Sequence, residues 1–302
     1  MGVPALFSTL IRNYNKPQND SIIIRKNITL AEGGKINFHL DFNSVLYLCL
    51  RPDSYIEIKD EDVLIVHILA YLDKLVAMMG AINVLHICLD GVSVEFKQVQ
   101  MRNRRMHSVI SRWRTNDINT RYGDASKELF HNSEFDTNRF SPGTVFMDKL
   151  SNALKAHLSS GAIYASIPEI ILSDTLVPGE GEIKILQWIK THPTSDDLIK
   201  TVIYALDADV IIQSLISGQR AIYLLRESGM FGHLGEFYDG ISFLYLDVDS
   251  LKTAFIDDLV RQCPLVESHP QKERFIHDLC LLFFMLGNDF IPKIHHISIY
   301  QN

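Results

Sequence analysis

Cysteine is scarce in this chain of 302 residues, and its placement argues against two kinds of site. The four cysteines stand apart in apolar surroundings and form no C-x-x-C pair: Cys49, Cys88, Cys263 and Cys280. We therefore expect neither a disulfide framework nor a zinc site. Such usage is typical of a reducing compartment, so the cytoplasm is the default expectation and the nucleus stays open as an alternative.

Long hydrophobic runs are also missing. The longest, Leu279 to Leu286, is far shorter than the roughly 20 apolar residues that a membrane-spanning helix needs. No basic segment precedes an apolar one at the N-terminus, and Leu6 breaks the myristoylation pattern that Gly2 begins. We expect neither export nor anchoring, and no membrane partner.

Positive charge is in the minority, since 29 Lys and Arg stand against 36 Asp and Glu for a net charge of −7. This total at first argues against a nucleic-acid partner. The distribution points the other way, because six Lys or Arg and no acid lie between Phe96 and Asn116. Divalent cations bound elsewhere to clustered carboxylates would largely cancel the acidic excess. The acidic total is thus compatible with a polyanionic substrate.

Apolar runs and turn signals alternate along the chain as in an α/β fold. Strands are expected at residues 36–42, 84–89, 167–172, 202–206, 221–225 and 241–246. Helices are expected at residues 1–14, 45–50, 60–79, 97–114, 142–158, 183–189, 209–216, 250–262 and 271–286, with Asp249 as the cap of the eighth. Residues from about 115 to 140 read as a surface excursion. The even spread of apolar residues predicts one domain over residues 1–302, with a mostly parallel central sheet flanked by helices.

The stretch from Leu172 to Lys184 carries the clearest chemical signal. Pro178 and Gly179 stop regular structure there, and Glu180 and Glu182 arrive just before a helical apolar pattern resumes. Within a helix these two carboxylates would point about 200° apart, but on an irregular, glycine-flanked backbone both can turn toward one centre. Paired carboxylates in such a loop are typical of a metal site.

More acids stand where buried strands end. Asp41, Asp90 and Asp207 stand at the ends of three predicted strands, and Asp209 comes two residues after Asp207. In open α/β sheets the carboxyl ends of the strands open onto the binding crevice. Asp289 follows the final predicted helix after a Gly-Asn pair. Taken singly, each acid has a plain structural explanation as a helix cap or a turn residue.

Together, these acids favour a metal-dependent hydrolase. Ionised carboxylates crowded at one crevice repel one another, so cations must neutralise them, and all-oxygen ligands select Mg²⁺ or Mn²⁺ over zinc. Two such ions roughly 3.5–4 Å apart would promote in-line displacement at a phosphodiester. The predicted catalytic and metal-binding residues are Asp41, Asp90, Glu180, Glu182, Asp207, Asp209 and Asp289.

The helix expected at residues 97–114 has a basic face. At about 100° per residue, Arg104 lies near −20° and Arg105 near 80° relative to Lys97, with Met101 between them. An ordinary solvated helix can carry the same run of charge. The helix begins soon after a strand-end acid, however, and this favours a role in gripping substrate phosphate.

At these residues the chain resembles the XRN family of 5′-to-3′ exoribonucleases. The motifs occur in family order over almost the whole chain: MGVPALF, LDFN, LDGV, SPGTVFM, SDTLVPGEGEIK, YALDADVI, LLRE and FMLGNDFIP. The resemblance implies a twisted α/β core of the PIN and flap-endonuclease type. It also implies two Mg²⁺ or Mn²⁺ ions held by the seven acids, and stepwise release of mononucleotides from single-stranded RNA with a 5′-monophosphate.

The resemblance also implies the residues that bind substrate. Lys97, Arg104 and Arg105 would bind the 5′-phosphate, and a site matched to that group would disfavour a triphosphate or a cap. Asn43, in the LDFN motif, joins them as a substrate-binding residue.

Two positions depart from the family pattern. Met101 stands where the family has a glutamine, so one hydrogen bond to phosphate is lost. Tyr47 replaces a histidine that stacks on the first base, and a tyrosine ring can still stack. Two other interpretations stay open: a structure-specific 5′ nuclease acting on DNA flaps, and a non-catalytic module that binds RNA 5′ ends.

Overall fold

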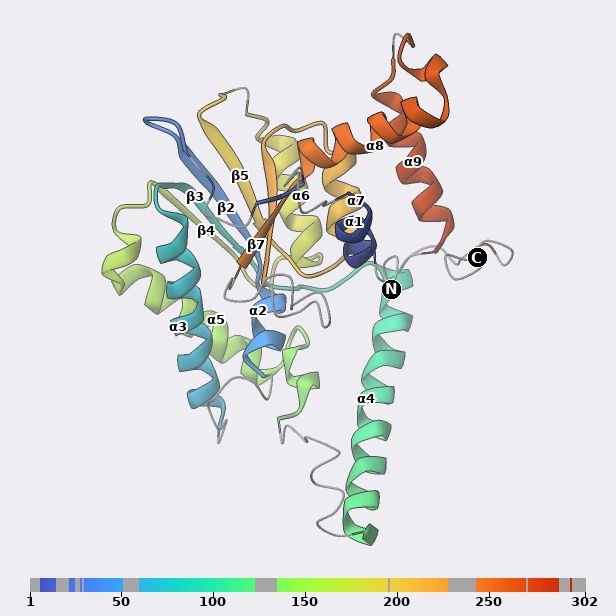
Figure 1. Cartoon of the computed structure of the whole chain (residues 1–302). Helices are drawn as coiled ribbons and strands as arrows, with labels where there is room; N and C mark the ends of the chain where they lie inside the picture. The colour runs from blue at the N-terminus through green and yellow to red at the C-terminus, as the bar shows by residue number, and fades with distance from the viewer. Residues whose placement is uncertain are drawn as a thin grey trace.

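A sheet of mostly parallel strands brings the ends of several strands to one edge of the molecule (Figure 1). The computed structural model describes residues 6–14, 22–24, 28, 30–50, 60–122, 135–194, 196–227, 243–269, 271–287 and 294. In these ranges the seven strands follow the order β1-β7-β6-β5-β2-β3-β4. Their bounds are β1 Ile23–Ile24, β2 Lys35–Asp41, β3 Ile82–Cys88, β4 Glu169–Ser173, β5 Ile199–Tyr204, β6 Ile222–Glu227 and β7 Phe243–Asp247.

The direction of the strands confirms the predicted mostly parallel sheet. All neighbours from β6 through β5, β2 and β3 to β4 run parallel. Only β7, beside β6, and β1, beside β7, are paired in the antiparallel sense. The two-residue strand β1 was not expected from the sequence, because two isoleucines are too short a run to show alternation.

Helices cover both faces of the sheet (Figure 1). Side chains of α2, α3 and α5 form one apolar cluster with the sheet, and those of α1, α6, α7, α8 and α9 form a second. The bounds are α1 Leu6–Tyr14, α2 Phe42–Cys49, α3 Glu61–Met79, α4 Glu95–Tyr122, α5 Val145–Ser160, α6 Gly181–Thr191, α7 Asp209–Ile216, α8 Val248–Gln262 and α9 Arg274–Met285. The predicted α/β fold is thus confirmed. No helix among the described residues is both long and apolar enough to span a membrane.

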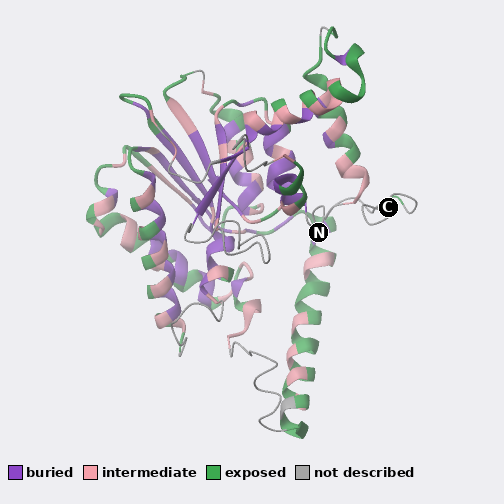
Figure 2. Ribbon diagram, in the orientation of Figure 1, coloured by how far each residue is buried: buried purple, intermediate pink, exposed green. Residues whose placement is uncertain are grey.

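Successive side chains along a strand point to opposite faces of the sheet and so pack into these two clusters in turn. In β5, Val202 and Tyr204 enter the cluster under α3, whereas Ile203 between them enters the other. All three side chains are buried, and Figure 2 shows buried residues along the strands. Burial on both faces is what a parallel sheet requires, and it holds the strand ends rigidly in place.

The start and end of α3 follow from local signals in the sequence. The Asp60 carboxylate accepts a hydrogen bond from Val63 N at 2.8 Å, which satisfies an amide of the first helical turn. At the other end Gly80 has a φ of 75°, a conformation that glycine adopts at little cost. The helix therefore matches the predicted range closely.

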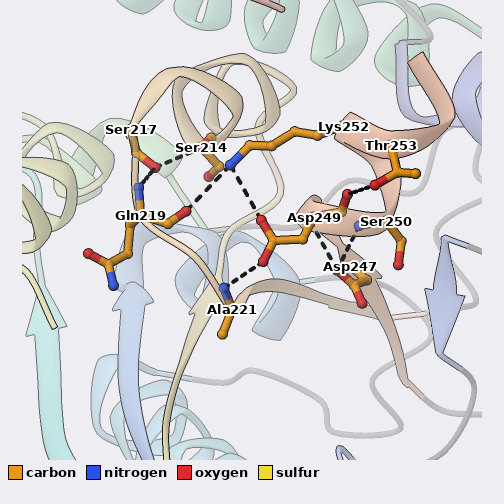
Figure 3. Close-up of polar contacts among 9 residues, drawn as sticks. All are labelled: Ser214, Ser217, Gln219, Ala221, Asp247, Asp249, Ser250, Lys252 and Thr253. Carbon is orange, nitrogen blue, oxygen red and sulfur yellow. Dashed lines mark hydrogen bonds and ion pairs between the residues drawn. The ribbon is translucent and has the colours of Figure 1, made fainter. Parts of the chain in front are cut away.

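The cap of α8 lies two residues earlier than predicted. Asp247, not Asp249, accepts hydrogen bonds from the amides of residues 249 and 250, as Figure 3 shows. The carboxylate of Asp249 instead accepts from Ala221 N at 2.8 Å and lies 3.4 Å from Lys252 Nζ. Ala221 has a φ of 54°, so Asp249 supports a strained turn in front of β6.

The basic helix is longer than the sequence predicts. α4 continues past Arg114 to Tyr122, so the first part of the expected surface excursion is helical. Residues 123–134 lie outside the described ranges, and a short 3-10 helix at Thr137–Phe140 follows them. Figure 1 shows α4 projecting from the body of the molecule, and Figure 2 shows it mostly exposed or intermediate. An extended polar helix lacks the apolar periodicity by which its end could be recognised.

Candidate active site

The acids of the predicted site come together because their strands are neighbours. Asp41 ends β2, Asp90 lies two residues beyond the end of β3, and Asp207 lies three residues beyond the end of β5. Since β5, β2 and β3 are adjacent and parallel, these three acids emerge at one edge of the sheet. Glu180, at the N-cap of α6, and Glu182, in its first turn, reach the same edge.

A cavity of about 410 Å³ marks this edge. Five of the seven predicted acids line it together with most of the predicted substrate-binding residues: Asp41, Asn43, Ser44, Tyr47, Asp90, Lys97, Met101, Arg104, Glu180, Glu182, Leu206 and Asp207. Asp209 is outside this lining, although its charge acts on Glu182 and the charge of Asp207 acts on it. Asp289 falls outside the described residues, so its predicted role stays a prediction.

Hydrogen bonds fix two of the carboxylates. Asn43 and Asp90 bind each other twice, through Asn43 Nδ2 to Asp90 Oδ2 at 2.7 Å and through Asp90 N to Asn43 Oδ1 at 3.2 Å. The second oxygen of Asp90 accepts from Gly181 N at 2.8 Å, and Ser44 Oγ donates to Asp41 Oδ2 at 2.7 Å. Asn43 therefore orients an acid in addition to lining the cavity.

Glycine is required where α6 meets β2. A Cβ atom on Gly181 would lie 2.6 Å from Asp41 Oδ1, closer than such atoms approach in real proteins. The helix can bring Glu180 and Glu182 next to Asp41 only because this side chain is absent. Neither Ser44 nor Gly181 was predicted from the sequence as a site residue. Ser44 comes three residues after Asp41, the acid at the end of β2, and this spacing is the signal that could have identified it.

Burial and mutual repulsion make the carboxyls hard to ionise. Burial, and then the charges of Asp90 and Asp207, raises the pKa of Asp41 to about 7. Burial and the charges of Asp207 and Asp41 raise the pKa of Glu182 to about 9. The pKa values of Asp90 and Asp209 are raised too, again chiefly by burial. Ionising these carboxyls therefore costs free energy, and bound cations would remove that cost.

The donor chemistry fits a divalent cation. Every predicted ligand is a carboxylate, and hard oxygen donors suit ions such as Mg²⁺ or Mn²⁺. Among the described residues, no group of three or more His, Cys, Asp or Glu side chains is already spaced to hold an ion. The fit accordingly rests on the donor set and on the raised pKa values.

Lys97 lies deeper than the phosphate-binding role predicts. Its ammonium forms an ion pair with Glu180, and both side chains are largely buried. Arg104 lines the cavity, whereas Arg105 is exposed on α4 and its Nε donates to Met101 O at 3.4 Å. The structure therefore brings Lys97 and Arg104 to the cavity and leaves Arg105 outside its lining.

The two departures from the family pattern both line the cavity. Met101 accepts a hydrogen bond from Ser93 Oγ at its sulfur, at 3.1 Å. Tyr47 is 47% exposed, and its ring meets Phe140 edge-on with 5.3 Å between centroids. An exposed aromatic ring held by a second ring is a suitable platform for a nucleobase.

Buried Arg226 holds the backbone of Asp207 in place. Its guanidinium is buried, donates to the backbone oxygen of Asp207 and lies 4.6 Å from the centroid of the Phe7 ring in α1. Burial lowers the pKa of Arg226 to about 10, which leaves the group charged at neutral pH. The amino-terminal helix and the acid cluster are thus joined by one side chain.

Comparison with known proteins agrees with this geometry. The family model described as the XRN 5′-3′ exonuclease N-terminus matches residues 1–228. Curated relatives named "5′-3′ exoribonuclease 2" include proteins of Neurospora crassa (28% identical), Cryptococcus neoformans (30%) and Candida albicans (29%). These matches cover 99–100% of this chain but only 32–35% of each relative, so the chain spans about a third of their length. The chain therefore belongs to the XRN 5′-3′ exonuclease family, matching the part known as its N-terminus.

Proposed function

We propose that this protein is a metal-dependent 5′-to-3′ exoribonuclease that hydrolyses 5′-monophosphorylated RNA to mononucleotides. One observation carries the proposal: five carboxylates from separate parts of the chain line a single cavity together with Lys97 and Arg104. Carboxylates suit the metal, and the cations suit a terminal phosphate. The relatives' name gives the same activity to proteins about three times as long.

The acidic residues of the cavity would bind metal, and the basic ones would bind the phosphate of the substrate. Two Mg²⁺ or Mn²⁺ ions would be held by the acids that line the cavity, Asp41, Asp90, Glu180, Glu182 and Asp207, together with Asp209 and Asp289. Such ions supply Lewis acidity for attack of water on a phosphodiester. The Lys97 ammonium, which pairs with Glu180 in the wall of the cavity, would also bind the 5′-phosphate. Arg104 adds a planar group able to bind two phosphate oxygens, and Tyr47 offers a surface to the first base.

The proposal is tested with end-labelled substrates. The purified chain and Mn²⁺ are incubated with RNA and with DNA carrying a 5′-monophosphate, a 5′-triphosphate or a flap. Release of labelled mononucleotide from 5′-monophosphate RNA alone is the expected result. Cleavage of DNA flaps would indicate the structure-specific nuclease instead, and binding without cleavage would indicate an end-binding module.

Replacing Arg104 with alanine should reduce the preference for a 5′-monophosphate over a 5′-hydroxyl by about tenfold or more. The guanidinium lines the cavity, and a charge-assisted pair with phosphate is worth about 1.5–3 kcal/mol. Competition between the two RNAs measures the preference. Arg114→Ala is the matched control, because this arginine is exposed farther along the same helix. An unchanged preference in Arg104→Ala would remove Arg104 from the phosphate site.

A further inference from the structure

The base of the acid cluster contains a buried lysine that the proposed chemistry does not use. Lys184 lies on α6, two residues after Glu182, and is only 6% exposed. At about 100° per residue its side chain points some 200° away from that of Glu182. Glu182 therefore faces the cavity while Lys184 faces the sheet behind it.

The ammonium of Lys184 joins two neighbouring strand ends. Its Nζ donates to Leu89 O at 2.7 Å and to Asp174 O at 3.0 Å. Leu89 immediately precedes Asp90 at the end of β3, and Asp174 immediately follows β4 at the start of the loop leading to Glu180. The parallel ladder stops here, so one side chain satisfies two carbonyls at the end of the sheet.

These contacts set the spacing between the acids. Lys184 holds the peptide before Asp90 against α6, and the first residue of α6 donates from Gly181 N to Asp90 Oδ1. The loop from 174 to 180 is tied to the same place by Gly91 N to Gly179 O at 2.8 Å. Without Lys184, the strand end that carries Asp90 and the helix that carries the two glutamates would be joined less firmly.

We infer that Lys184 is a positioning residue that fixes Asp90 relative to Glu180 and Glu182 and so sets the affinity of the site for divalent cations. This inference rests on the proposed function. The charge of Lys184 and its positioning role have opposite effects on the affinity for cations, and this makes the inference testable. Removing a positive charge beside Asp90 would by itself strengthen cation binding, whereas loosening the ligands would weaken it.

The test compares Mn²⁺ binding by titration calorimetry in the wild type, Lys184→Met and Lys155→Met. Methionine is close to lysine in length but has neither charge nor N–H donors. Lys155 is the matched control, since its Nζ pairs with the Asp174 carboxylate at 2.8 Å from a half-exposed position. We expect Mn²⁺ binding to weaken about tenfold or more in Lys184→Met and to stay within about twofold in Lys155→Met.

Thermal melting separates this effect from lost stability. If Lys184 only supports the fold, Lys184→Met will melt several degrees lower yet bind Mn²⁺ as tightly as the wild type below its melting point, and the inference fails. If Lys184→Met does not fold, Lys184→Gln replaces it with the same tenfold criterion, because glutamine is too short to reach both carbonyls. A wild type that neither binds Mn²⁺ nor cleaves RNA would overturn the proposed function itself.

Discussion

Replacing Asp207 with alanine should lower the rate of mononucleotide release by roughly a thousandfold or more while the protein stays folded. Asp207 lies in the middle of the cluster, since its charge acts on Asp41, Glu182 and Asp209. Its loss would remove one of the proposed metal ligands from the centre of the cluster. Single-turnover release of 5′-labelled nucleotide in Mn²⁺ measures the effect.

Folding of Asp207→Ala should be nearly unaffected. The variant loses one weak hydrogen bond, from Asp209 N to Asp207 Oδ1 at 3.2 Å, and the attraction of the Asp207 charge for buried Arg226. These losses are offset because the repulsion between Asp207 and the neighbouring acids is lost too. Circular dichroism melts would show this. Asp62→Ala is the matched control, because Asp62 is an exposed acid that pairs with Lys149 and does not line the cavity. A wild-type rate in Asp207→Ala would show that the acids around this cavity do not carry the chemistry.

The second large effect concerns pH and stability. In a chelating buffer, the free energy of unfolding should fall steadily between about pH 5 and pH 8. The pKa of Asp41 rises from 3.8 to about 7 and that of Glu182 from 4.5 to about 9 on folding. A carboxyl whose pKa is raised in the folded state stabilises that state only while protonated. Its contribution is complete below the unfolded pKa and is lost as pH rises through the folded pKa.

The loss is on the order of 1.4 kcal/mol per pH unit for each carboxyl that the folded state keeps protonated. Urea denaturation at several pH values, with chelator or with Mn²⁺, measures it. Bound cations should abolish most of the dependence of the free energy of unfolding on pH, because they replace the protons on the buried carboxyls. Glu182→Gln, a neutral variant of similar shape, should reduce the dependence of the free energy of unfolding on pH when chelator is present. A stability that is independent of pH and of Mn²⁺ would contradict the crowding of these carboxyls.

The position of the acids could be predicted because each depends on a local signal. Asp41, Asp90 and Asp207 stand at the ends of short apolar runs that the sequence predicts as strands, and parallel strands present their ends at one edge. The Pro-Gly break before Glu180 likewise marks a helix start that the structure confirms at Gly181. The family resemblance then supplied the order of the motifs and their expected roles.

The remaining features depend on contacts between distant residues. Lys184 meets the carbonyl of Leu89, 95 residues away in sequence, and no pattern of spacing predicts such a pair. The helical phase of Lys97 placed it on a face with Arg104, but the ion pair with Glu180 depends on how α6 packs. The cap of α8 is Asp247 and not Asp249 because the helix begins at Val248, two residues earlier than the sequence pattern predicts, and helix ends are the least predictable part of an element.

The contact between Phe7 and Arg226 makes α1 part of the framework behind Asp207. A chain shortened to begin after Tyr14 would open one side of a buried guanidinium to water and release the peptide that it holds. Catalytic defects would then arise from a truncation that removes none of the cavity-lining residues. Fusion partners for purification are accordingly better placed away from this helix.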